Sequence, residues 1–266
     1  MTKKLINKRA ILTLLLAMLL LCISATACST STKSTDVKAT NSKKESTTTG
    51  SIVIKYIGNS CFSITFADGT KLVTDPYGSS YASYFAPFPS LQADFVTISH
   101  SHGDHTSGLS EIKGTPKVLQ YGHLNTPLKV GDVEISAYSS IHAADMGENI
   151  IFVYKEGDYK IVHMGETDNI ESPEAKAAVK DADVLLTYAG EYGTIKNKDS
   201  FETLSKLNIK VMIPQHYSMD ASNLFYGQPT IDTILTELPA GTKVTKSKEL
   251  VVTKNMEKQF VVLTPN

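Results

Sequence analysis

The sequence predicts an α/β fold for residues 51–266, and two observations support this. Strand-like segments separated by turn residues dominate the first part of the region, at 52–57, 61–66, 71–74, 94–99, 133–138, 150–154 and 159–164. Further strand patterns then alternate with helical patterns, at 184–188, 209–213, 249–253 and 260–263. Such an order is typical of one domain in which helices flank sheets.

Helix start signals place the helical segments in the second part of the chain. Ser172-Pro173 offers an N-cap followed by proline at the first helical position, which predicts a helix over 174–180. Asp199 and Glu202 have the spacing of a capping box ahead of an apolar periodic run. A third helix is predicted over 229–238.

The N-terminus has the features of a targeting segment. Basic residues precede an apolar run, and small residues then lead to Cys28, an order typical of a secretory signal over residues 1–27. The run is short for a membrane span. The small residues before Cys28 are similar to a bacterial lipobox, so we expect a lipid on the Cys28 thiol and an extracytoplasmic, membrane-anchored protein. A signal peptide cut near Ala27, which would release a secreted protein, is the alternative.

Residues 28–50 are mainly Ser, Thr and Lys and predict a disordered tether, because they offer little apolar surface to bury.

Residues 51–266 hold 18 of the 26 basic and 25 of the 27 acidic residues, a formal net charge of about −7. This charge argues against a nucleic-acid partner, which needs a basic face. Cys61 lies in an apolar strand pattern and is expected to be a buried structural thiol. No pattern indicates the oligomeric state.

The residues that carry chemistry are His100-Ser101-His102-Gly103-Asp104-His105, which directly follow a predicted strand. His100 and His102 are two apart at a strand end, so their imidazoles project to the same side. Imidazole and carboxylate together suit zinc, iron or manganese. The cluster therefore predicts a metal site, with a polar loop of incidental histidines as the alternative.

More ligands must come from other segments, because one loop cannot fill a metal site. His142 follows the strand pattern at 133–138, and His216 lies just past the pattern at 209–213. Side chains at several strand ends commonly converge on one rim of an α/β sheet. The aromatic residues that follow Asp75 could cap such a site or pack against the core: Tyr77, Tyr81, Tyr84, Phe85 and Phe88.

With these residues, the sequence resembles the metallo-β-lactamase superfamily over essentially all of 51–266. The His-x-His-x-Asp-His motif of that family stands at His100–His105, and its final Pro-x-His-Tyr segment matches Pro214–Tyr217. Tyr56–Phe62 and Gly190–Ile195 are similar to the branch that contains ascorbate-phosphate lactonases. The resemblance implies a four-layer αββα sandwich.

The resemblance also implies two divalent metal ions, zinc in the first place and manganese or iron as alternatives. One ion would be held by His100, His102 and His142, and the other by Asp104, His105 and His216. The family usually bridges the two metals with the Asp of a Gly-Asp-Thr segment. Here Gly165-Glu166-Thr167 stands in that place, so Glu166 is expected to bridge, with Asp168 as the alternative.

Three further residues have expected roles beside the metals. Asp75 matches an early Asp-Pro of the family and would orient a ligand histidine, or else serve as a turn residue before Pro76. Asn59 stands where the branch often has a histidine, which makes it a candidate contact on the substrate side. His163 ends a strand beside the bridging carboxylate and would line the site or be structural.

The function implied is a metal-dependent hydrolase that uses a metal-activated hydroxide on a small ester, lactone or phosphodiester. Asp104 would orient the nucleophile and take up a proton. A β-lactamase is not expected, because His105 stands where several zinc β-lactamases of this fold carry cysteine. The alternative is a surface-tethered lipoprotein that binds a metal or a ligand without catalysis.

Overall fold

The computed structural model describes residues 50–120, 127–170, 172–191 and 195–265. The predicted signal peptide, Cys28 and the tether up to residue 49 lie outside this part, as do residues 192–194 of the Gly190–Ile195 segment. Within the described part no helix is both long and apolar enough to cross a membrane. All elements described below belong to one compact unit, Ser46–Asn266.

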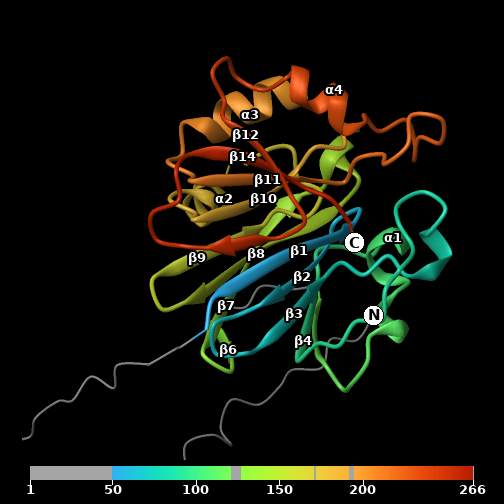
Figure 1. The fold of residues 1–266 in the computed structure, drawn as a ribbon, viewed down its shortest axis with the longest axis vertical. Helices are drawn as coiled ribbons and strands as arrows, with labels where there is room; N and C mark the ends of the chain where they lie inside the picture. The colour runs from blue at the N-terminus through green and yellow to red at the C-terminus, as the bar shows by residue number, and fades with distance from the viewer. Residues whose placement is uncertain (1–49, 121–126, 171, 192–194, 266) are drawn as a thin grey trace, which may run out of the picture. The chain divides into compact units, whose positions relative to one another are not determined.

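Two sheets form the body of this unit (Figure 1). The six-stranded sheet has the order β13-β1-β2-β3-β4-β5, with bounds Leu250–Val252, Ile52–Gly58, Cys61–Thr65, Lys71–Thr74, Phe95–Ile98 and Lys117–Gln120. The eight-stranded sheet has the order β12-β14-β11-β10-β9-β8-β7-β6, with bounds Val244–Ser247, Gln259–Leu263, Val211–Gln215, Val184–Tyr188, Tyr159–His163, Glu148–Glu156, Val133–Ile141 and Leu128–Val130.

Helices cover the two sheets unequally. The helices α2 (Pro173–Val179), α3 (Asn197–Ser205) and α4 (Ile231–Thr236) pack on the eight-stranded sheet (Figure 1). Beside the six-stranded sheet the described residues form only the short α1 (Gly103–Thr106), single 3-10 turns and loops. The predicted αββα fold class is confirmed, with its second helical layer reduced to these pieces.

Side chains alternate between the two faces of the six-stranded sheet. Along β1, Ile52, Ile54 and Tyr56 point inward and are at most 1% exposed, in the core shared with the eight-stranded sheet. Phe66, just past β2, contacts Tyr154 of β8 with ring centroids 6.4 Å apart. This period of two is what allows one sheet to face the core with one side only.

The outer face of the same sheet is also covered. Cys61 and Val96 from this face join Tyr77 and Phe85 in a second buried cluster. Cys61 is fully buried and free, which confirms the expected structural thiol. Part of the aromatic run after Asp75 therefore packs against the sheet, in place of a helical layer.

The structure corrects some sequence-based expectations. The Ser172 N-cap is confirmed, because its side chain accepts a hydrogen bond of 3.0 Å from the amide of Ala175. The capping box at Asp199 is wrong: α3 begins two residues earlier with Lys196 at the N-cap, so Asp199 lies inside the first turn. The strands β5, β6 and β12 were missed. All three are sheet edges, where partly exposed residues give a weak alternation.

A buried carboxylate ties the two sheets together. Glu156, at the end of β8, accepts hydrogen bonds of 2.8 Å from the backbone amides of Ala67 and Asp68 in the β2–β3 turn. Its side chain is 5% exposed, so its removal would leave two amides without a partner in a region poor in water.

We predict that Glu156→Ala lowers the free energy of unfolding by about 2 kcal/mol, because two charge-assisted hydrogen bonds are lost. Urea denaturation of the purified protein measures this change. The matched control is Glu148→Ala at the exposed start of the same strand, with an expected change within about 0.5 kcal/mol. Equal effects of the two substitutions would show that the inter-sheet contact contributes nothing.

Candidate metal centre

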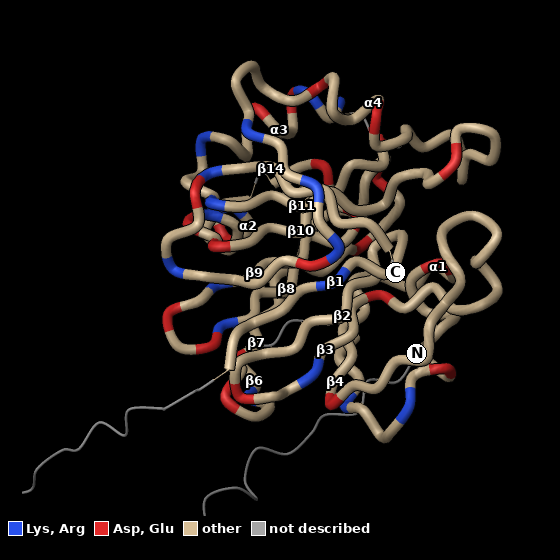
Figure 2. Tube along the Cα trace, in the orientation of Figure 1, with Lys and Arg blue, Asp and Glu red and all other residues tan. Residues whose placement is uncertain are grey.

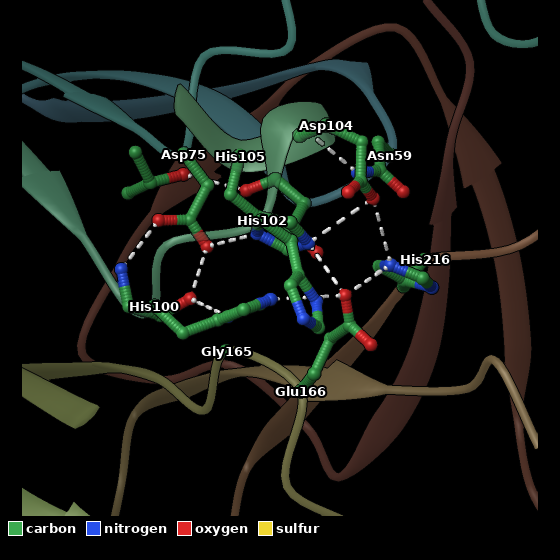
Figure 3. A network of polar contacts seen from close by, with 12 residues as sticks. Asn59, Asp75, His100, His102, Asp104, His105, Gly165, Glu166 and His216 are labelled. Atoms are coloured by element: carbon green, nitrogen blue, oxygen red, sulfur yellow. Dashed lines mark hydrogen bonds and ion pairs between the residues drawn. The ribbon is translucent and has the colours of Figure 1, made fainter. Parts of the chain in front are cut away.

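The predicted site residues meet at one edge of the two sheets, each just past the carboxyl end of a strand (Figure 3). Asp75 follows β3, His100 follows β4, His142 follows β7, Glu166 follows β9 and His216 follows β11. The cluster after β4 continues into α1. Because both sheets end here, side chains that are far apart in the sequence share one small space.

The Glu166 carboxylate is at the centre of this space. Its Oε1 atom lies 2.5 Å from Nε2 of His105, 2.5 Å from Nε2 of His216 and 3.4 Å from Nε2 of His100. Its Oε2 atom lies 3.2 Å from Nε2 of His142. One carboxylate therefore faces four imidazoles, which come from the segments after β4, β7 and β11 (Figure 3).

The potential ligand atoms fall into two groups that share Glu166. One group is His100, His102, His142 and Glu166, and the other is Asp104, His105, Glu166 and His216; the ligand atoms of each lie within 4.8 Å of one another. The division matches the one implied by the resemblance. Among the described residues Asp168 is in neither group, and its Oδ2 atom lies 3.4 Å from the amide of Ile195 instead.

Buried imidazole nitrogens without a hydrogen-bond partner favour the binding of cations in this space. The Nε2 atoms of His100, His142 and His216 are buried, and although they lie close to the Glu166 carboxylate, none of them makes a hydrogen bond of acceptable geometry. Burying such atoms unpaired is costly, and buried polar groups in proteins almost always have a partner. Imidazole nitrogen and carboxylate oxygen are ligands typical of zinc, so the residues present fit two metal ions.

His100, His105, His142 and His216 are each oriented through the other ring nitrogen. Nδ1 of His105 lies 2.8 Å from Oδ2 of Asp75, and Nδ1 of His142 donates to the carbonyl of Ala143 at 2.7 Å. These contacts put the proton on Nδ1 and leave Nε2 as the ligand atom. Asp75 is therefore placed as a residue that orients a ligand, although it also forms the turn after β3.

A serine extends this support to His100. The Ser99 hydroxyl donates to Oδ2 of Asp75 at 2.6 Å and lies 3.0 Å from Nδ1 of His100. Because the hydroxyl has one hydrogen and gives it to the carboxylate, it accepts the Nδ1 proton of His100. One buried carboxylate thus orients a histidine of each metal group.

His216 is oriented by a residue that the sequence did not suggest. The side-chain amide of Gln228 is 2% exposed and lies 2.7 Å from Nδ1 of His216. In the structure the amide nitrogen of Gln228 is the atom at this distance, so it donates and Nδ1 accepts. When Nε2 of His216 binds a metal, Nδ1 carries the proton, and a half-turn of the amide brings the Gln228 oxygen, which is otherwise unpaired, into place to accept it.

The carboxylates and imidazoles of the site shift each other's pKa values in opposite directions. Burial alone would raise the pKa values of Asp75 and Asp104, but the adjacent His105 imidazole lowers both. Glu166 is affected in the same way by His216. Burial alone would lower the pKa values of His105 and His216, but the carboxylates raise both. Protons supply the positive charge here when no metal does, so metal binding must displace them.

Asn59 is a positioning residue, not the substrate contact that was expected. It is fully buried and does not line the cavity. Its side-chain amide donates to the backbone carbonyl and to Oδ2 of Asp104, both at 3.0 Å. The backbone carbonyl of Asn59 accepts from the backbone amide of His216 at 2.8 Å. The residue therefore holds two members of the second metal group together.

His163 is likewise not on the substrate side. It is fully buried, and its Nε2 lies 3.9 Å from Oδ2 of Asp75, behind the ligands. Its ring meets Phe62 edge-on with centroids 6.3 Å apart. It is absent from the residues that line the cavity, so of the two roles left open the structural one agrees with its position.

The backbone adopts left-handed conformations where the ligands are presented. Asn59, Asp75 and His216 have φ values of 52°, 35° and 60°, which cost free energy for residues with a side chain and tend to cluster at functional sites. Gly165 has φ 61°, and a Cβ atom there would collide with Ser99 and Asn149. Glycine before Glu166 is thus required by its surroundings.

Asn149 was also missed by the sequence analysis. Its side chain accepts from the amide of Glu166 at 2.9 Å and donates to the carbonyl of Met164 at 2.8 Å, which shapes the turn that presents Glu166. A polar residue directly before the apolar run 150–154 was the available signal, because a buried amide needs a structural reason.

A cavity of about 320 Å³ lies over the ligand groups. His102, Asp104, His142, Glu166 and His216 contribute to its lining. The other lining residues come from α1 and from surrounding loops: Tyr81, Gly103, Met146, Phe225, Tyr226 and Gln228. The volume suits a small molecule, and the cavity gives it access to both groups.

Comparison with known proteins agrees with the fold and the site. A model of the β-lactamase superfamily domain matches residues 53–216, which span every proposed ligand. A UPF0173 metal-dependent hydrolase of Enterococcus faecalis is 26% identical over 188 residues, 60% of this chain and 84% of that protein. A similar hydrolase of Caldivirga maquilingensis is 22% identical over 187 residues, covering 62% of this chain and 82% of that protein.

Solved structures show the same architecture. A protein from Thermotoga maritima, provisionally described as a Zn-dependent hydrolase of the metallo-β-lactamase superfamily, is 28% identical with a TM-score of 0.64, covering 81% of this chain and all of that one. The metallo-β-lactamase fold protein YhfI from Bacillus subtilis, 14% identical, has a TM-score of 0.54 over 80% of this chain and 97% of its own. Given the family match over more than half of its length, this chain belongs to the metallo-β-lactamase superfamily of metal-dependent hydrolases.

Proposed function

We propose that this protein hydrolyses a small ester, lactone or phosphodiester with two metal ions, preferably zinc, outside the cytoplasm. The observation that carries the proposal is the Glu166 carboxylate shared between two groups of buried imidazoles, three of which have unpaired Nε2 atoms. The cavity over both groups supplies the space for a substrate.

The residues of the chain have separable tasks in this reaction. When bound, two cations lower the pKa of a water molecule and polarise the oxygen of the reacting group. Asp104 lies on the cavity side of the second group, where it would orient the attacking water and accept its proton. Asn59 fixes the Asp104 carboxylate by its hydrogen bond to Oδ2. Asp75 and Gln228 keep the imidazoles aligned from behind.

Glu166 and Asn59 depart from the family pattern, and these two departures are the sequence features compatible with a binding protein without catalysis. Glu166 reaches the two ligand groups with its longer side chain. Asn59 positions Asp104 and does not face the cavity. No observation specifically favours the non-catalytic alternative, so the hydrolase is the function proposed.

We predict that the purified protein holds about two metal ions per chain and that Glu166→Ala reduces this to one or fewer, because the shared ligand is lost. Elemental analysis by mass spectrometry measures the content and identifies the metal. Glu174→Ala, in the exposed first turn of α2, is the control and should change nothing. A wild-type content well below one ion per chain would contradict the two-metal proposal.

We predict that Asp104→Asn lowers kcat on the order of 100-fold, because the amide cannot accept a proton from the attacking water. Steady-state assays with ester, lactone and phosphodiester substrates test this, with metal content measured in parallel to separate catalysis from metal loss. Asp158→Asn in the exposed β8–β9 turn is the control and should retain full activity. An unchanged kcat in the Asp104 variant would remove Asp104 from the mechanism.

The location is also a proposal: a lipid on Cys28 anchors the protein to the membrane, with residues 28–50 as the tether. We predict that the full chain partitions into the membrane fraction of bacterial cells and incorporates labelled fatty acid, and that Cys28→Ala abolishes both. Cys22→Ser serves as the control. Recovery of the wild-type protein in the culture medium would instead support cleavage near Ala27.

A further inference from the structure

The walls of the cavity are apolar and carry no cation. Tyr81, Met146, Phe225 and Tyr226 supply the apolar surface, and the Gln228 amide adds a neutral polar group. No Lys or Arg is present among the described residues that line the cavity. The ligand groups at its base are therefore the only place in this lining where positive charge would be concentrated.

The sequence explains why the walls are uncharged. The single arginine of the chain is Arg9, so residues 51–266 offer no guanidinium for bidentate binding of a phosphate or carboxylate. The loop segments 76–91, 142–147 and 217–230 contain no lysine, and their only charged residues are Asp145 and Asp220. In Figure 2 the long loops beside α1 and below α4 accordingly show no blue.

The aromatic wall is held in place by the protein itself. Phe225 contacts Phe85 with ring centroids 4.9 Å apart and Tyr81 at 5.9 Å. The side chain of Asn223 donates to the carbonyl of Ser83 at 2.8 Å, which joins the two loops. A wall formed before binding costs little ordering entropy when a ligand arrives.

Two large apolar side chains lie open at this cavity. Tyr226 is 77% exposed and Met146 is 47% exposed, and both belong to the cavity lining. Exposed apolar groups gathered around a cavity are typical of ligand-binding surfaces. A substrate that extends from the metal groups towards solvent would cover them.

We propose that the substrate is an ester or lactone with an apolar acyl or alkyl group and with no anionic group apart from the reacting centre. This inference rests on the proposed hydrolase function and specifies its substrate class. The apolar group gains by leaving water for the Phe225–Tyr226 wall, whereas a second anion would lose its hydration without finding a cation. Lactones that carry a phosphate group are thereby disfavoured.

The reaction balances with water as its only co-reactant. The oxygen of one water molecule forms a new bond to the acyl carbon, and the bond from that carbon to the alkoxy oxygen breaks. One proton of the water ends on the alcohol and the other is released by the acid product. No electron is exchanged with another molecule.

Matched esters with one leaving group test the inference on the purified, metal-loaded protein. The probes are 4-nitrophenyl acetate, 4-nitrophenyl hexanoate and the mono-4-nitrophenyl ester of hexanedioic acid, which has the hexanoate chain length and a terminal carboxylate. We predict that kcat/KM rises about threefold for each added methylene from acetate to hexanoate. The hexanedioate ester should be at least about tenfold poorer than hexanoate. Equal or faster turnover of the hexanedioate ester overturns the inference.

Variants at the cavity mouth locate the effect. Tyr226→Ser and Met146→Ser should lower kcat/KM for hexanoate more than kcat/KM for acetate, which weakens the preference for hexanoate. The control is Tyr159→Ser, at the opposite end of β9 from His163, which should keep the wild-type preference. A preference that persists in a Tyr226→Ser, Met146→Ser double variant would show that the apolar group binds elsewhere.

Binding without turnover separates this inference from the proposed function. Calorimetry with hexanamide and with the monoamide of hexanedioic acid reports on the walls alone, because amides of this kind resist hydrolysis. If no ester is hydrolysed but hexanamide binds more tightly than its carboxylate analogue, the hydrolase proposal fails and the ligand chemistry stands. If esters are hydrolysed and the two amides bind equally, the inference alone fails.

Discussion

The shared Glu166 carboxylate is the contact on which the arrangement of the site depends. Two of its nearest imidazoles lie at 2.5 Å, from α1 and from the end of β11, so it joins segments of different sheets. Buried carboxylates and imidazoles are tolerated only when their charges are matched. The two sheets can therefore meet at this edge only with protons or cations between them. Bound metal ions would thus stabilise the contact between the sheets as well as take part in the chemistry.

The sequence predicted the metal ligands better than the residues that orient them. His100–His105 form a compact motif at a strand end, and His142 and His216 also follow strands, so backbone periodicity placed them together. The roles of Asn59 and His163 could not be decided from the sequence, because a pattern does not show whether a polar residue faces a cavity or lies behind it. Gln228 was missed, since only tertiary folding brings its loop beside His216.

The fold was predictable in its centre and less so at its edges. Strands buried on both faces, such as β10 and β11, are mainly apolar; β10 has the predicted bounds, and β11 lies two residues later than predicted. The edge strands β5, β6 and β12 have weaker patterns because one side pairs with no strand. The capping box at Asp199 failed for a similar reason: local spacing suggested one start, but packing of α3 selected another.

The hydrogen bond between Asn223 and Ser83, which joins two loops beside the cavity, bears on how such a protein can evolve. Neither of the loops it joins contains a proposed metal ligand, although the second begins directly after His216. Apart from Gln228, which contacts His216, substitutions in these loops would change which molecules the cavity admits without disturbing the metal ligands. Substrate preference could thus change during evolution while the metal ligands stay the same. This is one way in which a single fold comes to serve many reactions.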